Sequence, residues 1–275
     1  MSTVGRYALA GTAVEVEASA PLDDELRRVL VDLGPAGRGA ARHAAALFEA
    51  EDSFVLSRDG TPAAEPVSAS VALAGVLDMM NDVVAEHWSR RHVALHAAVV
   101  ERGGRALAFV GYSGSGKTTL AAAAVRSGWG FISDEVGLID DRFVAHAYHR
   151  PLGLRRGGRT VLQMPLSPER WHRSVQPEPA SNLGTLVSRA PLAALVFFNR
   201  SESAEPGLVT RMSPAAGLAH LLNNVLGTDG VEVKVFRRLE QMVRNVPVVH
   251  IGRCAPDDML TVLAPLVRAG ALSAP

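Results

Sequence analysis

Residues 111–118 read Gly-Tyr-Ser-Gly-Ser-Gly-Lys-Thr. They match the phosphate-binding loop pattern G-x-x-x-x-G-K-[ST] at every fixed position. In such a loop, glycines let backbone N–H groups turn inward around phosphate oxygens, which a Cβ would obstruct. Lys117 can then reach the β- and γ-phosphates, and the Thr118 hydroxyl can ligate Mg²⁺. We therefore predict a nucleotide-binding site made by Gly111, Ser113, Gly114, Ser115, Gly116, Lys117, Thr118 and Thr119.

The segments on either side suit this loop. Arg105–Val110 (RALAFV) is a short apolar run with strand character, and Thr119–Arg126 (TLAAAAVR) is alanine-rich and typical of a helix. The N-terminus of that helix would direct its partial positive charge at the phosphates. Lysine usage supports the prediction, because the chain holds 28 Lys and Arg residues but only two are lysines, Lys117 and Lys234. One of the two stands where the loop requires a slim ammonium.

Two acidic residues follow the next predicted strand. Phe131–Ser133 is β-rich and ends at Asp134 and Glu135. Only a short helix separates this strand from Thr118, so we predict that it runs beside the loop strand, with its C-terminal end next to the phosphates. An acid in this position completes a Mg²⁺ site or accepts the proton of the attacking hydroxyl. The residues alone leave Asp134 and Glu135 as equal candidates for these roles.

A basic stretch comes further along the chain. After a predicted hairpin at 136–148, residues 150–160 read RPLGLRRGGRT. We expect a glycine-containing loop that is mobile until substrate binds, because four arginines without nearby acids repel one another. Arg150 and Arg155 are candidates for gripping an acidic substrate or neutralising charge in the transition state.

The N-terminal third shows no catalytic constellation. Residues 4–17 alternate loosely and suggest strands, and Leu22–Leu33 has one apolar helical face. Ala40–Ala50 suggests a second helix or a loop, and Val71–His87 has helical periodicity. We expect residues 1–90 to form a small α+β lobe.

Further elements are predicted on either side of the basic stretch. Val93–Val100 is expected to form a hairpin with the loop strand, and Leu192–Phe198 is a buried-strand candidate. After it we predict helices at Ser213–Leu226 and Val231–Arg244. A strand at Val246–Ile251 and a helix at Pro256–Ala269 are predicted to follow.

Composition excludes several classes of partner. The charges of 28 acidic and 28 basic residues cancel, so the chain has no net electrostatic attraction to nucleic acid or to an anionic membrane. We therefore expect neither as a partner. The single cysteine, Cys254, cannot form an intramolecular disulfide and fits a reducing cytoplasm. The first residues lack the pattern of a signal peptide, and no apolar run is long enough to span a bilayer as a helix. We therefore predict a cytoplasmic protein.

Residues 95–140, LHAAVVERGGRALAFVGYSGSGKTTLAAAAVRSGWGFISDEVGLID, resemble the catalytic domain of HPr kinase/phosphorylase. The likeness consists of His96 on a strand, a glycine hairpin, the loop fifteen residues later, and an acidic pair 23 residues after the first glycine of the loop. Similar kinase-like proteins occur in peptide natural-product pathways, among them lasso-peptide kinases. The resemblance implies an α/β fold, a P-loop kinase domain of the HPr kinase and phosphoenolpyruvate carboxykinase type with a mixed sheet. This catalytic domain would cover residues 91–275.

The resemblance also implies roles for single residues. Asp134 would accept the hydroxyl proton as catalytic base, with His96 near it, and Lys117 and Thr118 would hold the phosphates and Mg²⁺. The chain departs from the family in having Asp-Glu instead of Asp-Asp at 134–135, and in lacking an acidic metal ligand ahead of Arg150. Glu135 is therefore our candidate to replace that ligand, and phosphorylase activity is not supported.

The function expected from these residues is that of an ATP-dependent kinase. It would transfer the γ-phosphate of ATP, with Mg²⁺, to a hydroxyl, most specifically a serine of a small protein or a ribosomal peptide undergoing tailoring. A small-molecule hydroxyl kinase on the same fold is one alternative. A nucleotide-binding partner protein with incomplete catalytic apparatus is another, because of the missing acid. A homo-oligomer is compatible with the resemblance, because the family often assembles into rings.

Overall fold

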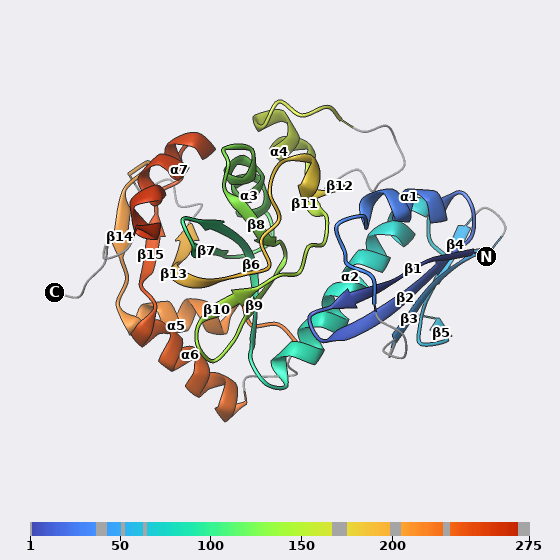
Figure 1. The fold of residues 1–275 in the computed structure, drawn as a ribbon, viewed down its shortest axis with the longest axis horizontal. Coiled ribbons are helices and arrows are strands. Elements are labelled where there is room, and N and C mark those ends of the chain that lie inside the picture. The colour runs from blue at the N-terminus through green and yellow to red at the C-terminus, as the bar shows by residue number, and fades with distance from the viewer. Residues whose placement is uncertain are drawn as a thin grey trace.

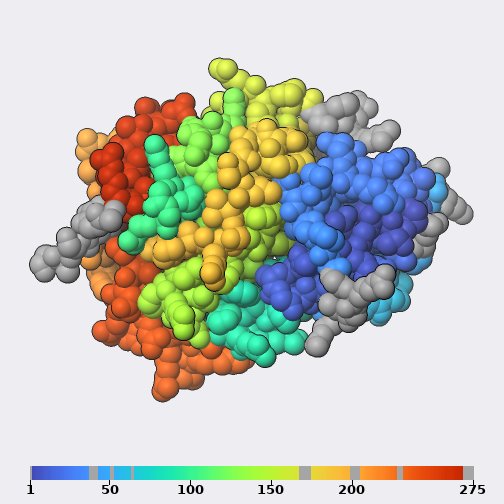
Figure 2. Space-filling model, in the orientation of Figure 1, coloured from blue at the N-terminus to red at the C-terminus, as the bar shows by residue number. Residues whose placement is uncertain are grey.

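The computed structural model describes residues 2–36, 43–50, 53–62, 65–166, 175–198, 205–227 and 232–268. Within them the fold is mixed α/β, with a five-stranded sheet near the N-terminus and an eight-stranded sheet formed by later residues (Figure 1). A two-stranded sheet, β11 with β12, adds to the second part. In Figure 2 the N-terminal residues, in blue, abut the later residues in yellow and green.

The smaller sheet has the strand order β1-β2-β3-β4-β5, with β2 and β3 parallel and the other pairs antiparallel. Its strands are β1 (Ser2–Leu9), β2 (Thr12–Ala18), β3 (His43–Ala50), β4 (Ser53–Arg58) and β5 (Thr61–Pro62). Two helices pack on it, α1 (Leu22–Val29) and α2 (Ala69–Ser89). Helix α2 also contacts β6 and β9 of the larger sheet, so one apolar core joins the two sheets. The proposed division at residue 90 stays a prediction.

The larger sheet has the order β10-β9-β6-β7-β13-β15-β14, with β8 also paired to β6. Its strands are β6 (Val93–Arg102), β7 (Arg105–Val110), β8 (Gly130–Ser133), β9 (Val136–Ile139), β10 (Val144–His146), β13 (Arg189–Phe198), β14 (Val209–Arg211) and β15 (Val248–Ile251). Strand β10 also pairs with the start of β13, which closes a ring of five strands, β10-β9-β6-β7-β13. Strands β7, β13 and β15 are parallel, whereas β6 is antiparallel to β7.

Helices cover both faces of this sheet, and its central strands are therefore apolar on both sides. Alternate residues of β7 point to opposite faces: Leu107 and Phe109 pack in the core with α3, and Ala108 and Val110 in the core with α6. The remaining helical and short elements are α3 (Lys117–Arg126), α4 (Arg156–Val161), α5 (Pro214–Leu222), α6 (Val233–Asn245), α7 (Pro256–Leu263), η1 (Ala180–Asn182), η2 (Ala264–Val267), β11 (Leu152–Leu154) and β12 (Gln176–Glu178).

Most predicted elements are confirmed, and three expectations are wrong. The stretch at 40–50, expected as a helix or a loop, is strand β3 over its described residues, because it fits between β2 and β4. Strand β8 does not run beside β7, because β6 lies between them. Residues 150–160 are not simply a loop: they contain β11 and α4. The predicted ends at 231 and 269 lie outside the described residues.

Candidate functional site

The loop at 111–116 joins β7 to α3. Gly116 precedes the helix with φ +106°, a conformation that side-chain-bearing residues rarely adopt, so glycine here lets the chain enter the helix directly. The first residues of the helix, Lys117, Thr118 and Thr119, line a pocket. Because the N–H groups of a helix's first turn have no partner within the helix, this end of the pocket suits an anion.

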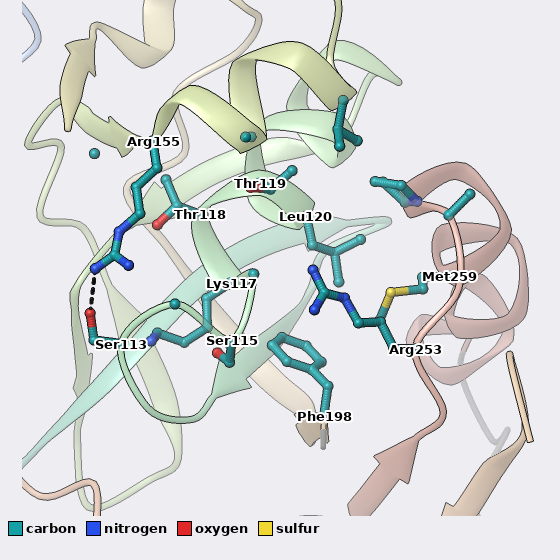
Figure 3. Close-up of a pocket in the computed structure, with 18 of the residues that line it drawn as sticks. Ser113, Ser115, Lys117, Thr118, Thr119, Leu120, Arg155, Phe198, Arg253 and Met259 are labelled. Atoms are coloured by element: carbon teal, nitrogen blue, oxygen red, sulfur yellow. Dashed lines mark hydrogen bonds between the residues drawn. The ribbon is translucent and has the colours of Figure 1, made fainter. Parts of the chain in front are cut away.

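The pocket has a volume of about 610 Å³ and two chemically different ends (Figure 3). The loop, Thr118 and Arg155 form a polar end. The other end is more apolar: it is lined by Leu120, Phe198 and Met259, together with one arginine, Arg253. A volume of this size accommodates a small organic ligand, and the division between a polar and an apolar end matches the phosphates and the base of a nucleotide.

The ammonium of Lys117 is held at the loop. Its Nζ donates to the carbonyl of Gly111 at 2.7 Å and to that of Tyr112 at 3.1 Å. The residue is 4% exposed, and burial lowers the pKa of the ammonium, while the nearby Glu135 and Asp134 carboxylates act in the opposite direction. An ammonium has three hydrogens, so the two carbonyls leave one for a phosphate oxygen.

Thr118 and Asp134 connect α3 to the end of β8. Thr118 Oγ1 donates to Asp134 Oδ1 at 3.0 Å, and the backbone N–H of Gly153 donates to Asp134 Oδ2 at 3.2 Å. Asp134 is fully buried, and burial, followed by the neighbouring Glu135 charge, raises its pKa to about 6. Strand β8 runs antiparallel to β6, which is itself antiparallel to β7, so β8 and β7 point the same way and end at the same edge.

Glu135 lies beside His96. Its Oε2 is 3.4 Å from His96 Nε2, close enough for an ion pair when the ring is protonated. That contact lacks hydrogen-bond geometry, and Nε2 has no hydrogen-bond partner among the described residues. Burial and, after it, the Lys117 charge lower the pKa of His96, which favours the neutral ring. Glu135 has a φ of +64°. Its side chain lines the nucleotide-sized pocket and also a second cavity. His96 lines the second cavity but not the first.

The arginines of 150–160 occupy different environments. Arg155 is exposed, and its Nη2 donates to Ser113 Oγ at 2.7 Å across the loop (Figure 3). Arg159 is buried and pairs with Glu178 at 2.9 Å, so the expectation that no acid lies near these arginines is wrong. Arg150 is 4% exposed, and no hydrogen bond or ion pair joins its side chain to any described residue.

The oxygen donors near the loop fit Mg²⁺. Thr118 gives its hydrogen to Asp134, which leaves the lone pairs of its oxygen available to a cation. Among the described residues, no group of three or more His, Cys, Asp or Glu side chains could hold a metal alone. Mg²⁺ takes one or two protein oxygens and completes its coordination with phosphate and water.

The structure therefore brings most predicted residues together. Ser113 to Thr119, Glu135 and Arg155 line one pocket, Gly111 bonds to Lys117, and Asp134 lies beneath Thr118. Sequence reasoning missed Phe198 and Arg253, which approach the pocket from β13 and from the segment after β15. No local pattern marks either residue, because only the parallel pairing of β7, β13 and β15 brings them beside α3.

No protein-family model matches the chain, and no curated protein matches it. Among solved structures, the chain is similar to the Hpr(Ser) kinase/phosphatase from Coxiella burnetii, with 9% sequence identity and a TM-score of 0.36. The match covers 62% of this chain and 91% of that one. The described residues contain no helix long and apolar enough to cross a membrane.

Proposed function

We propose that the protein binds ATP with Mg²⁺ and transfers the γ-phosphate to the hydroxyl of an acceptor. One observation carries this proposal: Lys117, Thr118 with its partner Asp134, and Glu135 meet at the polar end of one pocket. Phosphoryl transfer needs positive charge on the phosphates, a positioned cation and a group that takes the proton of the nucleophile. These residues offer all three functions.

The nucleotide would lie along the pocket. The loop and the third hydrogen of Lys117 bind the phosphates, Thr118 ligates Mg²⁺, and Asp134 fixes the threonine hydroxyl. Mg²⁺, when bound, neutralises negative charge on the β- and γ-phosphates. The base would contact Phe198 and Arg253 at the other end, because aromatic and guanidinium planes both stack on bases.

Glu135 is the group best placed to accept the proton. Its side chain is about a third exposed and lines both cavities, where an acceptor hydroxyl can approach the γ-phosphate. In the transfer the acceptor O–H bond breaks and its proton goes to the Glu135 carboxylate. The acceptor oxygen forms a bond to the γ-phosphorus, the bond from that phosphorus to the β–γ bridging oxygen breaks, and ADP leaves.

Asp134, the base implied by the sequence resemblance, is less well supported. Both of its oxygens accept hydrogen bonds inside the protein, and the side chain is fully buried. A proton acceptor must come within hydrogen-bond reach of the substrate hydroxyl. We therefore propose that Asp134 positions Thr118 and that Glu135 is the base, with the neutral His96 ring beside its carboxylate.

A serine of a small protein or a ribosomal peptide is the proposed acceptor, with a small hydroxyl compound as the alternative. The test is incubation with γ-labelled ATP, Mg²⁺ and both kinds of acceptor, using the parent and Glu135→Gln. Label should reach an acceptor with the parent and not with the variant. ATP binding without transfer to any acceptor would favour a nucleotide-binding partner protein, and no ATP binding would refute the proposal.

A further inference from the structure

A second cavity adjoins the nucleotide-sized pocket and shares Glu135 with it. Its volume is about 550 Å³, and it lies between α2, the strands β6 and β9, and the segment after α5. Figure 1 shows α2 passing beside β9, between the two sheets. A hydroxyl bound in this cavity would meet the polar end of the other pocket at Glu135. The cavity is thus on the acceptor side of the proposed base.

One wall of this cavity depends on a close backbone approach. Gly227 has φ +72°, and a Cβ there would come within 2.3 Å of the carbonyl oxygen of Ala85 on α2. Ser89 Oγ donates to the Gly227 carbonyl at 2.7 Å, and the N–H of Leu226 donates to the Ala94 carbonyl at 2.9 Å. The segment is therefore held against both α2 and β6, and the cavity has a fixed wall.

Helix α2 contributes three carboxylates to the lining. Asp78, Asp82 and Glu86 are four residues apart and so share one face of the helix. Glu86 is paired with Arg58 at 2.7 Å. Asp78 and Asp82, by contrast, form no ion pair with any described residue. Both residues are exposed, and partial desolvation raises the pKa of each carboxyl, with Arg150 acting in the opposite direction on Asp78 and the Glu86 charge adding to the rise at Asp82.

The other charged groups do not neutralise this face. Glu135 adds a further carboxylate, and His96 favours its neutral form. The buried guanidinium of Arg150 lowers the pKa of Asp78, so it offsets part of the negative charge at that residue. It pairs with neither carboxylate, and the face around Asp82 has no described cation besides Arg58, which is already bonded to Glu86.

Given the phosphotransfer proposed above, we propose that this cavity is the acceptor site and that it selects a hydroxyl carried close to a cationic group, an ammonium or a guanidinium. The hydroxyl lies at Glu135, and the cation faces Asp78 and Asp82. A serine beside Lys or Arg in a peptide has this chemistry, and so does a small amino alcohol. An acceptor that carries carboxylates next to its hydroxyl is repelled.

The test uses two pairs of matched probes with the full chain and ADP·Mg²⁺. One pair is a short serine peptide flanked by arginines and its counterpart flanked by glutamates. The other pair is ethanolamine and glycolate. Calorimetric binding and, with labelled ATP in place of ADP, transfer of label are measured for the parent, Asp82→Asn and the control Asp24→Asn, an exposed acid on α1. Binding of the arginine-flanked peptide would identify a peptide acceptor, and binding of ethanolamine would identify a small amino alcohol.

At least one cationic probe should bind and its anionic counterpart should not. Asp82→Asn should weaken binding of the cationic probe about tenfold or more, while Asp24→Asn leaves it unchanged. ATP affinity should be the same in all three proteins, because Asp82 does not line the nucleotide-sized pocket. Equal binding of cationic and anionic probes, no binding of either cationic probe, or no effect of Asp82→Asn would overturn the inference. Failure of the parent to bind ATP·Mg²⁺ would instead count against the proposed function.

Discussion

The Thr118 hydroxyl donates a hydrogen bond of 3.0 Å to Asp134, linking the first turn of α3 to the end of β8. This bond leaves the threonine oxygen free to ligate a cation and removes one oxygen of Asp134 from direct proton chemistry. The Gly153 N–H occupies the other oxygen. The geometry therefore separates the acidic pair, with Asp134 buried behind the loop and Glu135 open to both cavities.

Removing the Asp134 charge should make the stability of the metal-free protein less dependent on pH. The pKa of Asp134 in the folded protein, about 6, lies above its ordinary value of 3.8, so the folded state holds the proton more tightly than the unfolded state. The resulting stabilisation is complete below about pH 4 and is lost as the pH rises through about 6, a change of up to about 3 kcal/mol. Asp134→Asn has no such titration.

Thermal melts of both metal-free proteins between pH 4 and pH 7 test this. The melting temperature of Asp134→Asn relative to that of the parent should rise across this range. Carboxylates distant from Asp134 titrate equally in the two proteins and cancel in the difference. A difference that stays constant with pH would show that Asp134 has an ordinary pKa in the folded state.

Glu135→Gln should slow transfer by roughly 10²–10⁴-fold, the range expected when a general base is lost. ATP affinity should change by no more than a few-fold, because the loop and Lys117 still hold the phosphates. Single-turnover transfer and calorimetric ATP binding measure the two effects separately. Glu240→Gln, on the exposed face of α6, is the matched control. If Asp134→Asn abolished transfer while Glu135→Gln kept it near the parent rate, Asp134 would be the base.

Phe198→Leu should weaken ATP binding by about tenfold and leave binding of inorganic tripolyphosphate unchanged. The leucine keeps apolar volume against Phe109, whose ring centroid lies 6.0 Å from that of Phe198, but it cannot stack on a base. Stacking of a base on an aromatic ring contributes about 1–3 kcal/mol. Competition titrations with the two ligands distinguish the base end from the phosphate end. Equal weakening of both would place the base elsewhere.

Glu178→Gln should lower the free energy of unfolding by about 1–3 kcal/mol, because a hydrogen bond to a charged group is weakened in a buried place. Arg159 is 4% exposed and bonds to Glu178 and to the Pro165 carbonyl. Glu240→Gln, which breaks an exposed pair with Arg244, should cost less than about 1 kcal/mol. Denaturant unfolding compares the two. Equal costs would mean that the Arg159 pair does not anchor α4.

The loop, its flanking strand and helix, and the acidic pair could be predicted because their signals are local. The pattern at 111–118 fixes residue types over eight positions, and the hairpin of β6 and β7 joins neighbouring segments. Strand β3 could not be predicted, since its alanines favour a helix in isolation and only the pairing with β2 and β4 makes it a strand.

The second cavity also could not be predicted from the sequence, because it depends on packing between distant segments. The four-residue spacing of Asp78, Asp82 and Glu86 is visible in the sequence, but such a spacing alone does not distinguish an exposed cavity wall from an ordinary solvated helical face. Only the packing of α2 against β6 and β9 turns this face toward His96 and Glu135. Likewise, the ion pair between Arg159 and Glu178 joins positions that no local pattern connects, so the basic stretch was expected to be a mobile loop.

All roles proposed for this site depend on the binding of the ATP phosphates by Lys117 and the loop. The most direct measurement is calorimetric titration of ATP·Mg²⁺ into the parent, Lys117→Ala and Lys234→Ala. Lys234 is the only other lysine, and it is exposed and paired with Glu232 at 2.8 Å, far from the loop in the chain. The parent and Lys234→Ala should bind equally, and Lys117→Ala should lose about 100-fold or more in affinity, because the lost interaction is with a charged phosphate in a buried site. Binding of ATP·Mg²⁺ to Lys117→Ala with the affinity of the parent would show that Lys117 and the loop do not hold the phosphates.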